Sequence, residues 1–196
     1  VRAVGHDGAR VVNGFERHRP SGRVIAAFSG FEADLLRSLA SQMVELLRNE
    51  RAVPQTTEDP FEAMMSDFSG PTTIPEDPVL ARLFPTAYLD DEDAAADFRR
   101  FTEGTLRDGK AAASSHIIET LEAAGLPDEL SEDGLMIDVE LAEDEAMTWL
   151  RAFTDIRLAL ASRLGIEAND EDYWLALPDE DPRAQAHDIY DWMRWL

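Results

Sequence analysis

The stretch that decides the fold is AEDEAMTWLRAFTDIRLALASRL, which runs from Ala142 to Leu164 and is followed by Gly165. On a period of about 3.6 residues its apolar side chains fall on one broad face, which predicts a helix facing the core. Acidic residues suit its first turn, and the glycine suits a left-handed cap. We expect this helix at the centre of the fold. Its apolar face comprises Ala146, Trp149, Leu150, Phe153, Ile156, Leu160 and Leu164.

One cation interrupts this apolar face. Arg157 lies in the series between Phe153 and Leu160. A guanidinium in apolar surroundings must reach solvent or find a carboxylate. We expect a structural ion pair, with a recognition site as the alternative. Arg157 and the nearby Asp155 are therefore candidates for an ion pair or an interaction.

The charge balance limits the classes of partner. The chain has 196 residues, enough for one domain with a buried core. Its 40 Asp and Glu outnumber 18 Lys and Arg, giving a formal net charge of -22. Nucleic-acid binding needs cations that neutralise phosphates, so we expect no direct contact with DNA or RNA. A basic protein partner is the expected class, and a homodimer stays open.

Two absences exclude further classes. The sequence has no cysteine, which excludes disulfides, thiolate metal sites and cysteine nucleophiles in this chain. No apolar run approaches the ~18 residues of a membrane span, and the first residues lack a signal-peptide core. We therefore expect a cytoplasmic protein without a membrane segment.

The rest of the chain predicts one mostly helical domain over residues 13–196, preceded by a flexible tail at 1–12. A β-hairpin is expected over 15–28, with a third strand beside it at 135–141. Ser29 and Glu32 form a capping box that opens a helix ending near 49. The fold class is therefore mainly α, with about five to six helices and a small antiparallel sheet.

Three further helices are expected around prolines and apolar periods. One follows Asp59-Pro60, and its Phe and Met side chains fill a core or face a partner. Another follows Asp77-Pro78 and stops at Pro85. The longest spans 91–124, as one bent helix or two, because Gly104 and Gly109 weaken it. Its apolar period comprises Phe98, Phe101, Leu106, Ala113, Ile117, Leu121 and Ala124.

No catalytic, cofactor-binding or metal-binding residue is predicted. The segment from Gly104 to Ala111 matches a phosphate loop except at its last position, where a magnesium-binding hydroxyl is required. It also lies within a helix candidate, which would occupy its backbone amides. The four histidines are dispersed without metal-binding spacing, and the acidic runs at 90–93 and 169–172 are interpreted as solvated charge.

Aromatic residues gather near the end of the chain. The acidic stretch 169–182 is expected to be a loop or partly disordered, and a helix begins at Arg183. Large aromatic side chains beside charge either pack onto the central helix or anchor a partner. Both readings stay open for Trp174, Trp192 and Trp195.

Four segments together resemble an actinobacterial family of helical proteins of unknown function. These are EDPVLARLFPTAY (76–88), FRRFTEGTLRDGK (98–110), AMTWLRAFTDIRLALASRLGI (146–166) and YDWMRWL (190–196). Members are typically encoded beside the Clp-protease adaptor, and the family includes the actinomycete oxidative-stress regulator. Redox sensing by that regulator is associated with an N-terminal cysteine pair, which this sequence lacks. The resemblance also implies that the last helix continues beyond Leu196.

The resemblance implies a non-enzymatic regulatory protein that acts by protein contact, with a sigma factor or RNA polymerase as the expected partner. An accessory role in Clp-linked protein turnover is the alternative, suggested by the genomic neighbourhood. An enzyme of unrecognised type is a third reading, which a deep pocket with convergent polar groups would favour.

Overall fold

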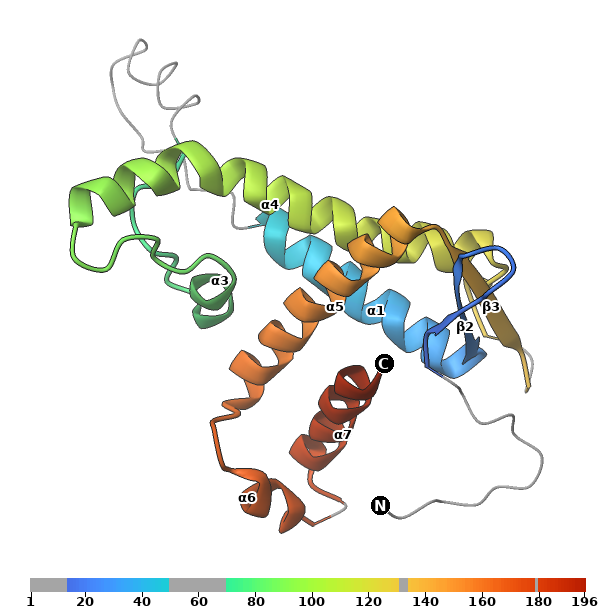
Figure 1. Cartoon of the computed structure of the whole chain (residues 1–196). Helices are drawn as coiled ribbons and strands as arrows, with labels where there is room; N and C mark the ends of the chain where they lie inside the picture. Colours follow the sequence, from blue (N-terminus) through green and yellow to red (C-terminus); the bar gives the residue numbers. More distant parts are fainter. Residues whose placement is uncertain (1–13, 50–69, 131–133, 179) are drawn as a thin grey trace.

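The computed structural model describes residues 14–49, 70–130, 134–178 and 180–196, which form six helices and one three-stranded sheet (Figure 1). The predicted mainly helical class is confirmed. The predicted tail at 1–12 and the helix after Asp59-Pro60 lie outside the described residues. The elements are β1 (Glu16–Arg17), β2 (Val24–Ser29), α1 (Gly30–Asn49), α3 (Pro78–Leu83), α4 (Glu92–Ala123), β3 (Met136–Leu141), α5 (Glu143–Leu164), α6 (Glu171–Leu175) and α7 (Pro182–Trp195).

The sheet joins two strands from the first 30 residues to a strand that directly precedes α5. Strand β2 lies between β1 and β3 and pairs with both in the antiparallel sense. Phe28 is opposite Ile137 in this register, and both side chains are buried. The prediction of a third strand beside the hairpin is confirmed. The alternation of the strands places one face of the sheet against the helices.

Helix α5 is central, as predicted. It contacts α1, α3, α4, α7 and β3. Its aromatic rings pack against Phe15 and Phe28, with centroids 5.5 to 6.3 Å apart in the cluster. Gly165 caps the helix in the left-handed region, at φ 70°. Leu150 departs from the prediction and is exposed, because it lies about 100° round the helix from the buried Trp149.

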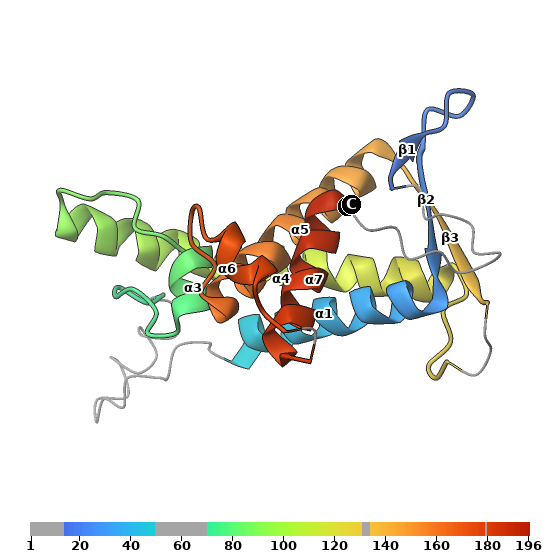
Figure 2. The ribbon, with the colours of Figure 1, turned by 90° about the horizontal axis from the view of Figure 1, so that it is seen from below.

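Helix α1 begins with the predicted capping box. The Glu32 carboxylate accepts from the Ser29 N–H at 2.8 Å, and the Ser29 hydroxyl accepts from the Glu32 N–H at 3.3 Å. The helix then packs along α4, and Figure 2 shows the two side by side. Their contact buries Leu36, Met43 and Leu47.

Helix α4 settles the question of one helix or two. It is a continuous helix of 32 residues that begins at the N-cap Asp91. An added Cβ at Gly104 or Gly109 would meet no atom within 4 Å, so both glycines occupy open positions of the helix. The first half of α4 extends beyond α1 and α5 (Figure 1).

The acidic stretch before α7 corrects one prediction. Expected to be a loop or partly disordered, it contains the short helix α6. Asp170 stabilises this turn because its carboxylate accepts both from the Glu167 N–H and from the Trp174 indole, each at 2.8 Å. These bonds, the backbone bond first, hold the pKa of Asp170 below its usual value. Among the described residues, no helix has the length and apolar character to cross a membrane.

Candidate functional site

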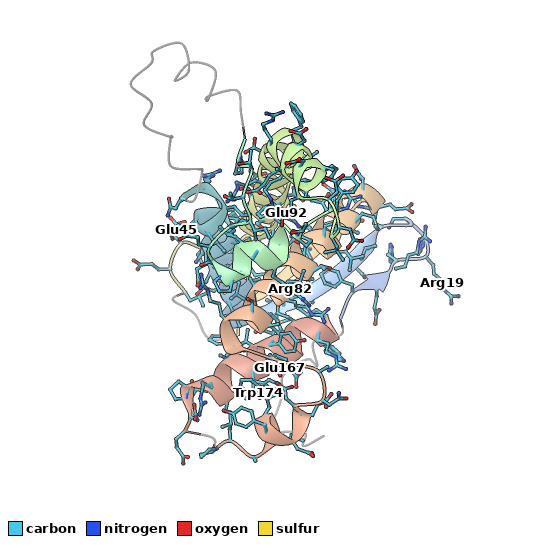
Figure 3. The ribbon with its side chains drawn as sticks, turned by 90° about the vertical axis from the view of Figure 1, so that its left-hand side faces the viewer. Arg19, Glu45, Arg82, Glu92, Glu167 and Trp174 are labelled. Carbon is cyan, nitrogen blue, oxygen red and sulfur yellow. The ribbon has the colours of Figure 1, made fainter. Side chains whose placement is uncertain are left out.

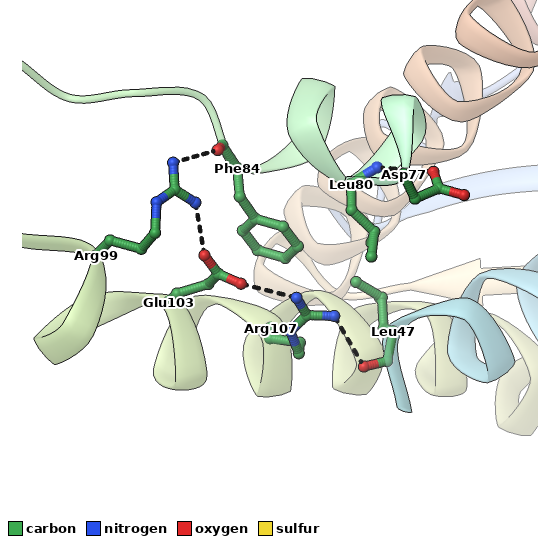
Figure 4. A network of polar contacts seen from close by, with 7 residues as sticks. All are labelled: Leu47, Asp77, Leu80, Phe84, Arg99, Glu103 and Arg107. Carbon is green, nitrogen blue, oxygen red and sulfur yellow. Dashed lines mark hydrogen bonds and ion pairs between the residues drawn. The ribbon is translucent and has the colours of Figure 1, made fainter. Parts of the chain in front are cut away.

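A buried ladder of charges lies on one face of α4. Arg99, Glu103 and Arg107 are spaced four residues apart, so their side chains stack along the helix. Glu103 is only 2% exposed. Its two carboxylate oxygens accept from Arg99 at 2.6 Å and from Arg107 at 2.7 Å (Figure 4). One carboxylate therefore satisfies two buried guanidinium groups.

The two arginines also donate hydrogen bonds to carbonyls at the C-terminal ends of α3 and α1. Arg99 donates to the carbonyl of Phe84, the C-cap of α3, at 3.0 Å. Arg107 donates to the carbonyl of Leu47, in the last turn of α1, at 3.3 Å. Terminal carbonyls of helices lack partners within the helix and attract cations. The ladder therefore fixes α1 and α3 to the first half of α4.

Helix α3 is held at its other end by Asp77. One carboxylate oxygen accepts from the amides of Val79 and Leu80, at 2.7 and 3.3 Å, and the other from Arg163 of α5 at 2.8 Å. Burial raises the pKa of Asp77, but the bonds to Arg163 and to the two amides outweigh it. The pKa of Asp77 therefore lies below its usual value.

The segment that resembles a phosphate loop has a structural role. The whole segment from Gly104 to Ala111 lies within α4, as predicted. Lys110 forms an ion pair with the buried Asp155 at 2.6 Å and thereby links α4 to α5. The predicted site residue Asp155 is thus engaged within the fold.

Outside the ladder, this half of α4 carries apolar side chains into solvent. Phe98, Phe101 and Leu106 are 42%, 71% and 48% exposed, although the sequence predicted them to face the core. The prediction is wrong here because the arginine ladder occupies the buried face: Phe98 and Phe101 lie about 100° or more round the helix from it, and Leu106 lies about 60° from Glu103, at the edge of that face. We name the exposed set the α4 aromatic surface: Tyr88, Leu89, Phe98, Phe101 and Leu106.

Two contacts hold rings of this surface in place. Tyr88 and Phe98 pack edge to face, with centroids 5.9 Å apart. The Arg100 guanidinium lies over the Phe101 ring, 4.6 Å from its centroid, and pairs with Asp97 at 3.0 Å. The rings are therefore partly ordered by their own neighbours.

Carboxylates border the α4 aromatic surface. We name the exposed set the acidic rim: Asp90, Asp91, Glu92, Asp93 and Asp97. Figure 3 views this end of the molecule, with Glu92 labelled at the start of α4. The nearby cations Arg99 and Arg100 are each engaged by a carboxylate. An apolar centre with a charged border is the composition of a protein-binding surface.

The C-terminal tryptophans are mostly covered. Trp174 is buried, and its ring stacks on His187 with centroids 4.8 Å apart. Trp192 is partly buried against the core, and Trp195 is exposed. Of these three candidate anchors, Trp195 alone presents most of its ring to solvent.

Arg157 uses a ring where a carboxylate was expected. Its guanidinium lies over Tyr190 of α7, 5.9 Å from the ring centroid. Within the described part of the chain it makes no ion pair, and the expected ion pair stays a prediction. The packing of α7 on α5 brings the Tyr190 ring to this position.

The ladder and the exposed rings were missed by sequence reasoning. The Arg-x-x-x-Glu-x-x-x-Arg spacing at 99–107 was available as a signal, because it places three charges on one helical face. Which face is buried depends on where the ends of α1 and α3 meet α4. That arrangement leaves no local trace in the sequence.

Comparison with known proteins assigns the family. The model of a domain of unknown function, DUF2017, matches residues 12–196. The chain belongs to the DUF2017 family. The oxidative stress regulator AosR of Mycobacterium tuberculosis (strain H37Rv) is 29% identical over 191 residues, covering 91% of this chain and 80% of the relative. The putative oxidative stress regulator AosR of Mycobacterium leprae is 31% identical over 178 residues, covering 84% and 75%.

The comparisons confirm the resemblance seen in the sequence, which pointed to an actinobacterial family that includes an oxidative-stress regulator. No solved structure matches this DUF2017 chain.

Proposed function

We propose that this protein is a non-enzymatic cytoplasmic regulator that acts by protein–protein contact, with a sigma factor or RNA polymerase as its partner. The observation that carries the proposal is the naming of its relatives, which are called oxidative stress regulators and match over most of this chain. A net charge of -22 supports a basic protein partner and opposes contact with a phosphate backbone.

The response to oxidants differs from a thiol switch. This sequence contains no cysteine, so no disulfide or sulfenic acid forms within it. The family relationship therefore carries over the regulatory role and not a disulfide switch within residues 1–196.

A direct binding measurement tests the proposal. The purified chain is titrated with core RNA polymerase, with holoenzyme and with individual sigma factors of its host, and binding is followed by biolayer interferometry. We expect micromolar or tighter binding to at least one of them, weakening as salt rises because opposite charges meet. Duplex DNA at moderate salt serves as the negative control.

Two outcomes would overturn the proposal. Binding to none of these proteins, together with binding to Clp components, would support the alternative role in protein turnover. Tight binding to bare duplex DNA would contradict the argument from charge.

A further inference from the structure

We propose that the α4 aromatic surface is the docking site for a basic amphipathic helix of another protein, a proposal that rests on the protein-contact function proposed above. The surface includes two phenylalanines of α4 whose side chains are exposed, Phe98 and Phe101. Exposed apolar patches bordered by polar residues mark interaction sites. Its charge and shape decide the class of occupant.

The length of the surface fits a helix lying alongside α4. Phe98 and Leu106 are eight residues apart, which corresponds to about 12 Å along the helix axis. An amphipathic helix presents apolar anchors over a similar length, at positions i, i+3 or i+4, and i+7. Gly109 lies about 20° from Phe98 round the helix and leaves open space, so a partner can approach closely there.

The acidic rim sets the charge of that partner. Its five carboxylates lie at the start of α4 and beside Phe98, so arginines or lysines that flank the apolar anchors meet opposite charge. Arg100 lies over the Phe101 ring, and Asp97 already engages its charge. An acidic partner helix would bring like charges together.

Part of the surface is ordered before it binds. The ladder of Arg99, Glu103 and Arg107 holds the buried face of α4 against the ends of α1 and α3. Tyr88 packs against Phe98, which restrains that ring. Preorganised side chains lose less conformational freedom on binding.

The same charge argument disfavours two other occupants. A second copy of this chain in a symmetric dimer would place one acidic rim near the other. Residues 50–69 of the chain itself contain five carboxylates and a single arginine, so they are also acidic. A basic segment from another protein is the occupant that the charges favour.

The probe is a labelled synthetic peptide of about 18 residues, with leucines on one helical face and lysines and arginines on the other. A permuted peptide of identical composition, which cannot place its leucines on one face, is the control. Each labelled peptide is titrated with the full chain, and binding is followed by the fluorescence anisotropy of the label. We expect the amphipathic peptide to bind at least about tenfold more tightly than the permuted peptide.

Matched variants locate the binding. Phe98→Ser with Phe101→Ser is expected to weaken binding by at least about tenfold, to the level of the permuted peptide. Phe31→Ser is the control, because Phe31 is also 71% exposed but lies at the start of α1. We expect it to leave binding unchanged.

A second pair of variants tests the charge. Asp90→Asn with Asp93→Asn should weaken binding and flatten its salt dependence. The control, Glu119→Gln with Glu122→Gln, removes the same charge from exposed positions of the second half of α4 and should have a smaller effect. Equal effects of the two pairs would overturn the role of the rim.

Four results overturn the docking site. The first is equal binding of the two peptides, and the second is unchanged peptide binding by the phenylalanine variant. The third is a dimer of the chain in sedimentation that dissociates in this variant. The fourth is cross-linking of a photo-reactive phenylalanine analogue at position 101 to residues 50–69. If polymerase or a sigma factor binds the phenylalanine variant as tightly as the unchanged chain, the docking site is wrong and the proposed function is retained. Peptide binding at the surface without any polymerase or sigma binding does the reverse.

Discussion

The two halves of α4 bury opposite kinds of side chain: the second half buries apolar residues, and the first half buries charged ones. In the second half, Ile117 and Leu121 are buried while Glu119 and Glu122 face solvent. In the first half, the arginine ladder is buried and the phenylalanines are outside. The second half packs along α1, whereas the first half meets the ends of helices, whose free carbonyls need donors. The first half of α4 therefore buries the charged groups that bind these carbonyls, and its phenylalanines lie on the exposed side.

The largest expected effect comes from the centre of the ladder. Glu103→Ala leaves two guanidinium groups buried side by side without their carboxylate. We expect the free energy of unfolding to fall by about 3–5 kcal/mol, the usual cost of breaking a buried ion pair. Urea denaturation followed by circular dichroism measures it. Glu119→Ala, in the second half, should change it by less than about 0.5 kcal/mol.

A triple variant separates the two roles of the ladder. Arg99→Met, Glu103→Leu and Arg107→Met together remove every buried charge, which is often neutral or stabilising. Here the carbonyls of Phe84 and Leu47 would lose their donors, so we expect only partial recovery relative to Glu103→Ala. Full recovery would show that the capping bonds contribute little.

The second prediction compares two leucines of the same helix. Leu121→Ala creates a cavity in the core and should lower the free energy of unfolding by about 2–5 kcal/mol. Leu106→Ala trims a half-exposed side chain in the first half, and we expect a change within about 0.5 kcal/mol. Equal losses in denaturant would mean that Leu106 packs against the fold, contrary to the contrast between the halves.

These two halves also mark what the sequence predicts well and poorly. The capping box at Ser29 and the proline start of α3 were predicted because their partners lie within three residues. Arg107 binds a carbonyl 60 residues away, and Lys110 pairs with a carboxylate 45 residues away. Apolar periodicity predicts a helix. It does not predict which side is buried where one side carries apolar residues and the other carries charges that can pair. For the candidate site, the sequence shows the acidic run at 90–93 and indicates solvated charge. Its position beside exposed aromatic rings was not predicted.

The third prediction concerns the cap of α3, which the ladder holds at the opposite end. Asp77→Ala should cost about 1 kcal/mol in the free energy of unfolding. The pKa of Asp77 is lowered in the folded state, so its contribution is fully present above the unfolded pKa and is lost as pH falls through the folded value. Stability should therefore decline below about pH 4, and less steeply in Asp77→Asn. Identical acid transitions in the two proteins would contradict this account.

The smallest effect is a gain. Gly109→Ala adds a methyl group where nothing lies within 4 Å, and alanine restricts the unfolded chain. We expect thermal or urea unfolding to show an increase of about 0.5–1 kcal/mol. The amphipathic peptide should bind this stabilised variant more weakly, because the methyl group stands on the side where a partner helix approaches. Unchanged peptide binding would place the partner away from Gly109.

Lys110 gives this fold a built-in chemical reporter. It is the only lysine of the sequence, and its ammonium group is engaged with Asp155 across the contact between α4 and α5. Amine-reactive labels modify free amines, so within this sequence the side-chain reaction is confined to one position. The rate of labelling at Lys110 therefore measures how often its ion pair with Asp155 opens at the contact between α4 and α5.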